Sequence, residues 1–260
     1  PARTDEERKA LEDFVVASLP DPVYGGQLQD LAVPGLKAEG RMVIAYEEQP
    51  VELAGGTVVS LRRPDYSVAD LGYGPMDTET TLSPRMTPQM IGMGLIEAIH
   101  PADLLAHADP DDRDGDGVSG RVAMARDPAT GKLAIGRFGW KAQNATVRQQ
   151  TADAFAGDIG IATPDNPAGH GDCTPHQAEC LALPTGEQAD LGQTEAPDPV
   201  LELVTFYSQN LAVPARRLVD DAQVLAGKQT FYTLGCTSCH VPKFVTSRRA
   251  ATEAHRFQLI

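Results

Sequence analysis

Apolar residues near the N-terminus recur at helical spacing. Thr4 and Glu7 have the three-residue separation of a capping box, and Pro20 stops the pattern. The apolar face between these signals consists of Leu11, Phe14, Val15 and Leu19. The pattern therefore predicts an amphipathic helix that ends before Pro20.

Two further stretches are typical of β-hairpins. Residues 41–48 and 57–64 are rich in β-branched and aromatic residues, and Gly55-Gly56 turns the chain between them. Residues 121–127 and 132–138 predict a second, shorter hairpin.

The remaining periodic segments are helical. Residues 89–99 predict one helix, Pro101 opens another, and residues 200–211 and 222–232 are strongly apolar. Asn144 is the predicted cap of a further helix. Its expected buried face is Val147, Thr151, Ala154 and Phe155.

Residues 157–199 lack such periodicity. This stretch is rich in Gly, Pro, Asp and Thr, so it predicts a long irregular loop that must be tied down. The predicted fold class is therefore mainly α with small β additions.

Charge and composition narrow the classes of partner. The net charge is −14, which excludes nucleic acid. An acidic surface fits a basic protein partner, although solubility alone explains it and is the preferred interpretation. No apolar run approaches the roughly 18 residues of a membrane span. Because the chain begins with Pro1, we expect a mature product whose signal peptide has been removed.

Cys236, Cys239 and His240 form a Cys-x-x-Cys-His motif with three competing interpretations. A thioredoxin-like pair needs a βαβ context, which the flanks lack. A zinc half-site needs a second pair, and Cys173 with Cys180 is a poorly spaced candidate. In a c-type haem site, the two thiols bond the vinyl groups and His240 is the proximal iron ligand. This interpretation uses every element of the motif and is favoured.

The flanking residues agree with haem attachment. Gly227 and Phe231 have the spacing of the packing pair usual before a c-type haem motif, and Pro242 follows soon after.

With these motifs the chain resembles the bacterial di-haem oxidoreductases, relatives of di-haem cytochrome c peroxidase that are sometimes labelled thiol oxidoreductases. The matching stretches are 24–30, 39–48, 82–99, 108–121, 136–143, 211–217 and 235–244. The resemblance implies cytochrome c-like haem domains with inserted hairpins. It assigns 1–199 to the body of a first domain that lacks its haem motif, with the loop 157–199, and 200–260 to the start of a second domain.

Two departures from the family matter. No second Cys-x-x-Cys-His lies upstream, and the segment that completes the second haem pocket is not present. We therefore expect an internal fragment that is inactive alone, with the peroxide-reducing haem held by the missing upstream motif.

Alternate positions before Gly117 are occupied by Asp112, Asp114 and Asp116. This spacing is typical of a calcium-binding loop with oxygen ligands, in which the backbone carbonyl of Val118 would be a further ligand. The acid expected at the twelfth position is replaced by Ala123, for which Asp109 or Asp127 would have to substitute. An ordinary solvated acidic turn is the alternative.

Cys173 and Cys180 lie inside the irregular loop. Haem attachment implies an oxidising compartment, where such a pair becomes a disulfide. His170 and His176 are interleaved with the pair, so a Cys2His2 metal site is the alternative.

Three residues are candidates for catalysis. Glu97 interrupts an apolar helix, so it either faces solvent or is an acid in the distal haem pocket. In the second case it would move a proton during peroxide cleavage, and Arg85 would stabilise the negative charge that develops. The resemblance implies that Trp140 relays electrons between haems, although burial in the core is the preferred interpretation.

Together these features predict a periplasmic di-haem oxidoreductase that reduces peroxide or another small oxidant. Its expected electron donor is a small cytochrome or a cupredoxin. The alternative is an electron-transfer cytochrome or accessory binding protein without turnover of its own.

Overall fold

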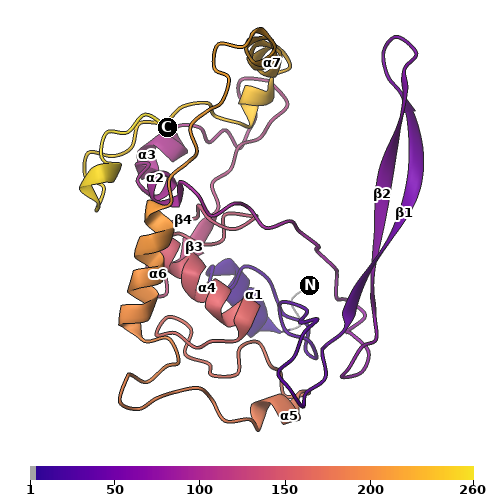
Figure 1. Ribbon diagram of the computed structural model, residues 1–260, viewed down its shortest axis with the longest axis vertical. Helices are drawn as coiled ribbons and strands as arrows, with labels where there is room; N and C mark the ends of the chain where they lie inside the picture. Colours follow the sequence, from indigo (N-terminus) through magenta and orange to yellow (C-terminus); the bar gives the residue numbers. More distant parts are fainter. Residues whose placement is uncertain (1–3) are drawn as a thin grey trace. The chain divides into compact units, whose positions relative to one another are not determined.

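The computed structural model describes residues 4–260 (Figure 1). These residues form two compact units. Unit 1 comprises residues 4–11, Ser18–Thr87 and Asp153–Pro197, and unit 2 comprises Glu12–Ala17, Pro88–Ala152 and Asp198–Ile260. In this part of the chain no helix is long and apolar enough to cross a membrane.

The most regular element of unit 1 is a two-stranded antiparallel ribbon. Strand β1 (Arg41–Glu52) pairs with β2 (Val58–Ala69) along their full length. Most of its side chains are exposed, and charged cross-strand pairs such as Arg63 with Glu47, at 2.5 Å, hold its register. The predicted hairpin is confirmed and is longer than the sequence pattern indicated.

The rest of unit 1 is held by buried polar groups. Tyr24 is 2% exposed, and its hydroxyl donates to the Gly74 carbonyl at 2.6 Å. Buried Glu39 accepts hydrogen bonds from the Gln29 amide and from the Gln177 side chain. Burial raises the pKa of Glu39. These contacts fasten the irregular loop to the N-terminal part of the unit. Helices occupy both ends of the predicted loop 157–199, at 157–159 and 198–199, and between these ends the one helix is α5 (Ala178–Leu181).

The core of unit 2 forms where its helices meet the second hairpin. Met93, Phe138 and Val147 make one buried cluster. The elements of this part are α2 (Met93–Glu97), α3 (Pro101–Leu105), β3 (Met124–Arg126), β4 (Leu133–Ile135), α4 (Val147–Ile159) and α6 (Asp198–Asn210). The second half of α4 belongs to unit 1, so this helix is common to both units.

The C-terminal part of unit 2 contains α7 (Ala222–Thr233) and the 3-10 turns η1 (Cys236–Ser238) and η2 (Glu253–His255). After η1 the chain returns to α2, where the Ser247 amide donates to the Ala98 carbonyl at 2.8 Å. Residues 244–246 also pair with 258–260, so the tail is anchored within its own unit.

The predicted fold class, mainly α, is wrong. Residues 4–260 contain seven short α-helices and two antiparallel sheets, and the 12-residue strands of the ribbon rival the longest helices. Frequent Pro and Gly, 20 and 24 in the chain, interrupt helical segments and explain why they stay short.

Two predicted helices are shorter than expected for local reasons. Helix α1 (Asp5–Glu12) ends before Phe14, which has a left-handed φ of 54° and is exposed together with Val15, so the expected buried face does not form. Gly92, with a φ of 69°, delays the start of α2 within the segment 89–99.

Candidate functional site

The Cys-x-x-Cys-His motif follows directly from the end of α7. Asp221 caps this helix by accepting hydrogen bonds from the Gln223 and Val224 amides at 2.8 and 3.2 Å. Gly235, with a φ of 74°, ends the helix in the left-handed conformation that favours glycine. The η1 turn then begins at the first cysteine of the motif.

The η1 turn brings the three donor residues onto adjacent positions of one helical turn. The amides of Cys239 and His240 both donate to the Cys236 carbonyl, at 3.3 and 2.9 Å. Both thiols are free; Cys236 is half-buried, and Cys239 and His240 are exposed. The Phe231 ring lies 5.9 Å from the imidazole.

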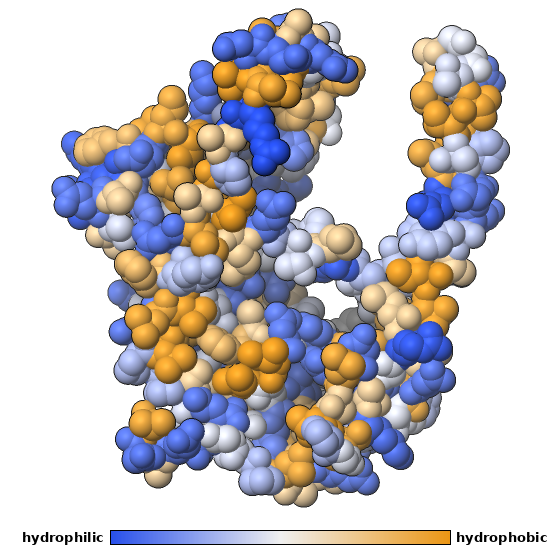
Figure 2. All heavy atoms as spheres, viewed as in Figure 1, coloured by the Kyte–Doolittle hydropathy of each residue, from blue (hydrophilic) through white to orange (hydrophobic). Residues whose placement is uncertain are grey.

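The surroundings of this turn are apolar and uncovered. No residue of α7 is buried, although the helix is rich in apolar side chains. Leu225 is 50% exposed and Leu234 73%, and hydrophobic residues lie beside hydrophilic ones on this part of the surface (Figure 2). Two free thiols, a free imidazole and an exposed apolar helix are the donors and the wall that a c-type haem requires, so the residues present fit that group.

The two competing interpretations of the motif lose their support. The motif follows a helix and has no parallel strand on either side, so the βαβ context of a thioredoxin-like pair is absent from residues 4–260. Cys173 and Cys180 form a disulfide and therefore cannot complete a zinc site.

The disulfide between Cys173 and Cys180 confirms the predicted pairing, with 6.4 Å between the two Cα atoms. Asp172, next to it, accepts hydrogen bonds from the Gly26 and Gln27 amides at 2.5 and 3.1 Å. The disulfide thus holds the segment that ties the irregular loop to residues 23–39. It also removes the thiols that the alternative Cys2His2 site needs.

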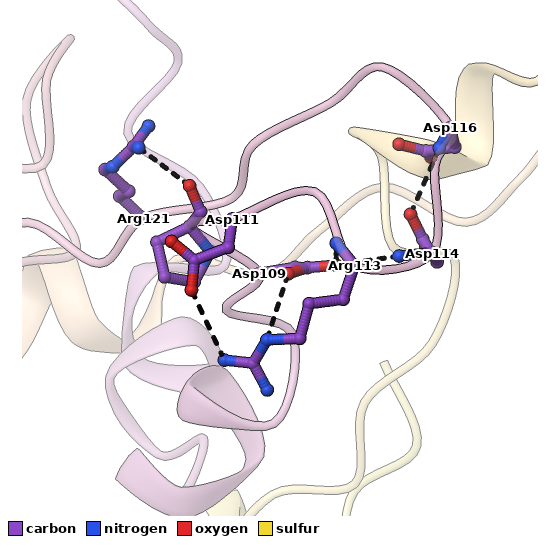
Figure 3. A network of polar contacts seen from close by, with 7 residues as sticks. Asp109, Asp111, Arg113, Asp114, Asp116 and Arg121 are labelled. Carbon is purple, nitrogen blue, oxygen red and sulfur yellow. Dashed lines mark hydrogen bonds and ion pairs between the residues drawn. The ribbon is translucent and has the colours of Figure 1, made fainter.

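The acidic loop, residues 109–118, brings three carboxylates together, and Figure 3 shows two of them, Asp114 and Asp116. One oxygen each of Asp112, Asp114 and Asp116 lies within 4.8 Å of the others. Two of these carboxylates also accept hydrogen bonds from backbone amides of the loop. Asp112 accepts from the Gly117 amide at 3.1 Å, and Asp116 accepts from the Val118 amide at 2.8 Å. This is the arrangement of an oxygen-ligand loop, and it is equally that of an acidic turn with its own hydrogen bonds.

The two acids named as substitutes for the twelfth ligand have other partners. Asp109 accepts the Arg113 amide at 2.8 Å and lies 3.8 Å from its guanidinium (Figure 3). Asp127 accepts from Ala129 and Thr130 in the turn of the second hairpin. Calcium binding at this loop stays a prediction.

Glu97 lies at the end of α2, half-buried, where it connects three helices. One carboxylate oxygen accepts the Val147 amide at the start of α4, at 2.8 Å, and the other accepts the Gln209 side chain of α6, at 2.6 Å. The interpretation of Glu97 as a solvent-facing residue is therefore wrong. Burial lowers the pKa of nearby Arg137, and the Glu97 charge opposes that effect.

The other two catalytic candidates are exposed. Arg85 belongs to unit 1, whereas Glu97 belongs to unit 2, and the Arg85 guanidinium donates to Ser83 at 3.1 Å. Trp140 is 55% exposed, so its preferred interpretation as a core residue is wrong. The proton-transfer and electron-relay roles of these residues stay predictions.

Sequence reasoning missed what begins helix α4. Its first turn is capped by Thr146, whose hydroxyl accepts the Gln149 amide at 3.0 Å, and by Glu97 from a distant segment. Predicted cap Asn144 instead donates to the Gln150 side chain. A threonine directly before the apolar face was a local signal for this cap, whereas the contribution of Glu97 has no local signal.

Comparison with known proteins gives one match. The family model described as "Di-haem oxidoreductase, putative peroxidase" matches residues 3–257, nearly the whole chain. The searches of curated proteins and of solved structures found no match to this chain.

Proposed function

The chain belongs to the di-haem oxidoreductase family, and on that premise we propose that Cys236, Cys239 and His240 hold a c-type haem that carries electrons toward peroxide. The observation that carries the proposal is the pair of free thiols and the free imidazole on one turn beside an exposed apolar helix. When bound, the haem supplies one-electron redox chemistry.

The residues of the motif divide this work. The thiols of Cys236 and Cys239 form the covalent attachment, and His240 offers an imidazole nitrogen to the iron. Phe231 packs near the imidazole and restricts its orientation.

In this proposal residues 1–199 are the body of a first haem domain and residues 200–260 begin a second. This division differs from the two compact units, because unit 2 combines residues 88–152 with 198–260. Cys236, Cys239 and His240 would hold the haem that supplies one-electron transfer, and the proposed electron donor is a small cytochrome or a cupredoxin. Trp140, exposed in unit 2, is a proposed relay, and the other haem of the family would supply the peroxide chemistry.

Glu97 and Arg85 are the proposed proton-transfer and charge-stabilising residues. To move a proton, the Glu97 carboxylate must release the Gln209 amide that it accepts at 2.6 Å. The Val147 amide would keep the other oxygen oriented during this change.

We place the protein in the periplasm or another extracytoplasmic compartment. Two features support this: the Cys173–Cys180 disulfide persists in oxidising compartments, and c-type haem is attached outside the cytoplasm. Calcium at Asp112, Asp114 and Asp116 is part of the same proposal and is supported by the proximity of their carboxylates.

One observation favours the alternative of an electron-transfer cytochrome without turnover. Both carboxylate oxygens of Glu97, the acid expected near a distal pocket, accept hydrogen bonds that join helices. A carrier needs no such acid, so Glu97 would then be purely structural.

The test is spectroscopic and uses protein matured in an extracytoplasmic compartment. His240→Ala should keep covalent haem but change its visible spectrum in both redox states, whereas Cys236→Ala should lower the haem content. His176→Ala, an exposed histidine of unit 1, is the control and should leave the spectrum unchanged. An unchanged spectrum in His240→Ala would contradict the proposal.

A further inference from the structure

Charge is distributed unevenly along the chain. Residues 211–260 contain seven Lys and Arg against three Asp and Glu, a net charge of +4. Because the whole chain carries −14, residues 1–210 carry −18. The segment that contains the Cys-x-x-Cys-His motif is thus a basic region of an acidic protein.

The cations of this region are exposed and have no acidic partner. The exposed ones are Arg216, Arg217, Lys228, Lys243, Arg248 and Arg249. Among residues 4–260 none of them makes an ion pair, whereas Arg41, Arg63 and Arg148 elsewhere each pair with a carboxylate at 3.1 Å or less. An unpaired cation is free to attract a partner from solution.

Both segments that flank the motif are anchored to the same part of unit 2. Before α7, the Leu211 carbonyl accepts the Gly92 amide at 2.9 Å; after η1, the Ser247 amide donates to the Ala98 carbonyl at 2.8 Å. The chain therefore leaves helix α2 and its neighbours, forms the motif and returns to them. Its cations are on the approaches to the motif on both sides.

The same region exposes apolar side chains. Outside α7, Val213 is 56% exposed, Leu218 71% and Val219 50%. Exposed apolar residues and unpaired cations within one segment are the composition of a protein interface that combines apolar contacts with charged ones.

We propose that residues 211–260, the basic region, dock a protein with an acidic surface, and that this protein is the electron donor. The role as donor depends on the proposed function, whereas the preference for an acidic partner depends only on the charges. Two haem propionates would neutralise at most two of the six exposed cations, so the region stays positive when haem is bound.

The net charge of the whole molecule predicts the opposite partner. A chain of −14 would attract a basic protein from a distance. At physiological salt, however, charges further away than about 8 Å are screened, so distant acids count little. In this proposal the exposed cations outweigh the acidic loop, which begins two residues after His107, whose ring lies 5.4 Å from that of Phe244. The two views therefore predict opposite signs for the effect of salt.

The test that does not need haem is an NMR titration of two labelled small electron-transfer proteins, an acidic cupredoxin and a basic cytochrome c, with the purified chain. At low salt we expect line broadening of the acidic protein, which added salt removes, and little effect on the basic one. Stronger binding of the basic protein would overturn the inference.

A charge-reversal pair with a matched control sharpens the result. Arg216→Glu/Arg217→Glu should weaken binding of the acidic protein about tenfold at low salt. The control is Lys37→Glu/Lys132→Glu, which changes the net charge by the same amount at exposed positions outside the region. We expect this control to change the affinity less than about twofold. Equal effects of the two variants would overturn the inference.

Reduction of the holoprotein by the acidic cupredoxin, followed by stopped flow, tests the role as donor. We expect a rate constant that falls with salt and falls again in Arg216→Glu/Arg217→Glu. Salt-sensitive binding without any reduction would keep the docking surface and contradict the proposed function. Reduction that becomes faster with salt would contradict the docking surface and keep the proposed function.

Discussion

Replacing Glu97 with alanine should destabilise unit 2, because its carboxylate joins the ends of three helices. Glu97 lies at the end of α2. Its carboxylate accepts one hydrogen bond from the Val147 amide at the start of α4 and another from the Gln209 side chain on α6. A negative charge at a helix N-terminus is favourable in addition to the hydrogen bond itself. Removing the carboxylate leaves the amide of buried Val147 and the Gln209 side-chain donor without their acceptor.

The expected magnitude follows from these contacts. A hydrogen bond to a charged group contributes about 1.5–3 kcal/mol, and half-burial places each of the two at the lower end, so the loss is about 3 kcal/mol. Glu97→Gln keeps one acceptor oxygen and should lose roughly half as much. With an m-value of about 2 kcal/mol per M urea, Glu97→Ala should lower the unfolding midpoint by about 1.5 M.

Urea unfolding followed by fluorescence of Trp140, the only tryptophan, reports on this unit. Glu202→Ala is the matched control, because Glu202 is an exposed acid on α6 whose removal should change stability by less than about 0.5 kcal/mol. Equal midpoints for Glu97→Ala and Glu202→Ala would refute the structural role. A normal midpoint with lost peroxide reduction would assign Glu97 to catalysis instead.

Three further predictions concern other sites. Joint replacement of Cys173 and Cys180 by serine should lower the free energy of unfolding of unit 1 by about 2–3 kcal/mol, since the disulfide closes an eight-residue loop, and chemical denaturation checks this; no change would contradict it. Joint replacement of Asp114 and Asp116 by asparagine should lower the melting temperature in calcium but not in chelator, and equal shifts would indicate an acidic turn. Burial raises the pKa of Asp21, but its hydrogen bonds to Thr80, Val23 and neighbouring amides outweigh that effect and lower the pKa below its usual 3.8. Asp21→Asn should therefore be less stable than wild type by about 1–2 kcal/mol at neutral pH, a difference that is lost as pH falls below 3.8 through the lowered pKa; a difference independent of pH would be inconsistent with this reasoning.

Local patterns predicted the elements whose signals are local. The ribbon β1–β2, the second hairpin and helices α6 and α7 all occur where alternation, turn residues and helical spacing indicated them. The pairing of Cys173 with Cys180 was predictable because haem attachment implies an oxidising compartment, in which such a pair becomes a disulfide. The proximity of the Cys236, Cys239 and His240 side chains was also predictable, because residues this close in sequence lie on one helical turn.

Features that depend on distant contacts could not be predicted. The face of Leu11, Phe14 and Val15 has helical spacing but ends in a left-handed residue at Phe14, and spacing alone does not indicate what would cover it. Trp140 was placed in the core on the strength of its size, yet it is exposed beside buried Phe138. Glu97 gained its partners from residues 50 and 112 positions away.

The central claim is that Cys236 and Cys239 carry a covalently bound haem. The most direct measurement is mass spectrometry of the peptide that contains both cysteines, taken from protein matured in an extracytoplasmic compartment with the attachment machinery. We predict the peptide mass with one haem added, absorption of the same fraction in the visible region, and loss of the added mass when both cysteines are replaced by alanine. Free thiols, a Cys236–Cys239 disulfide or bound zinc in the wild-type peptide would contradict the account.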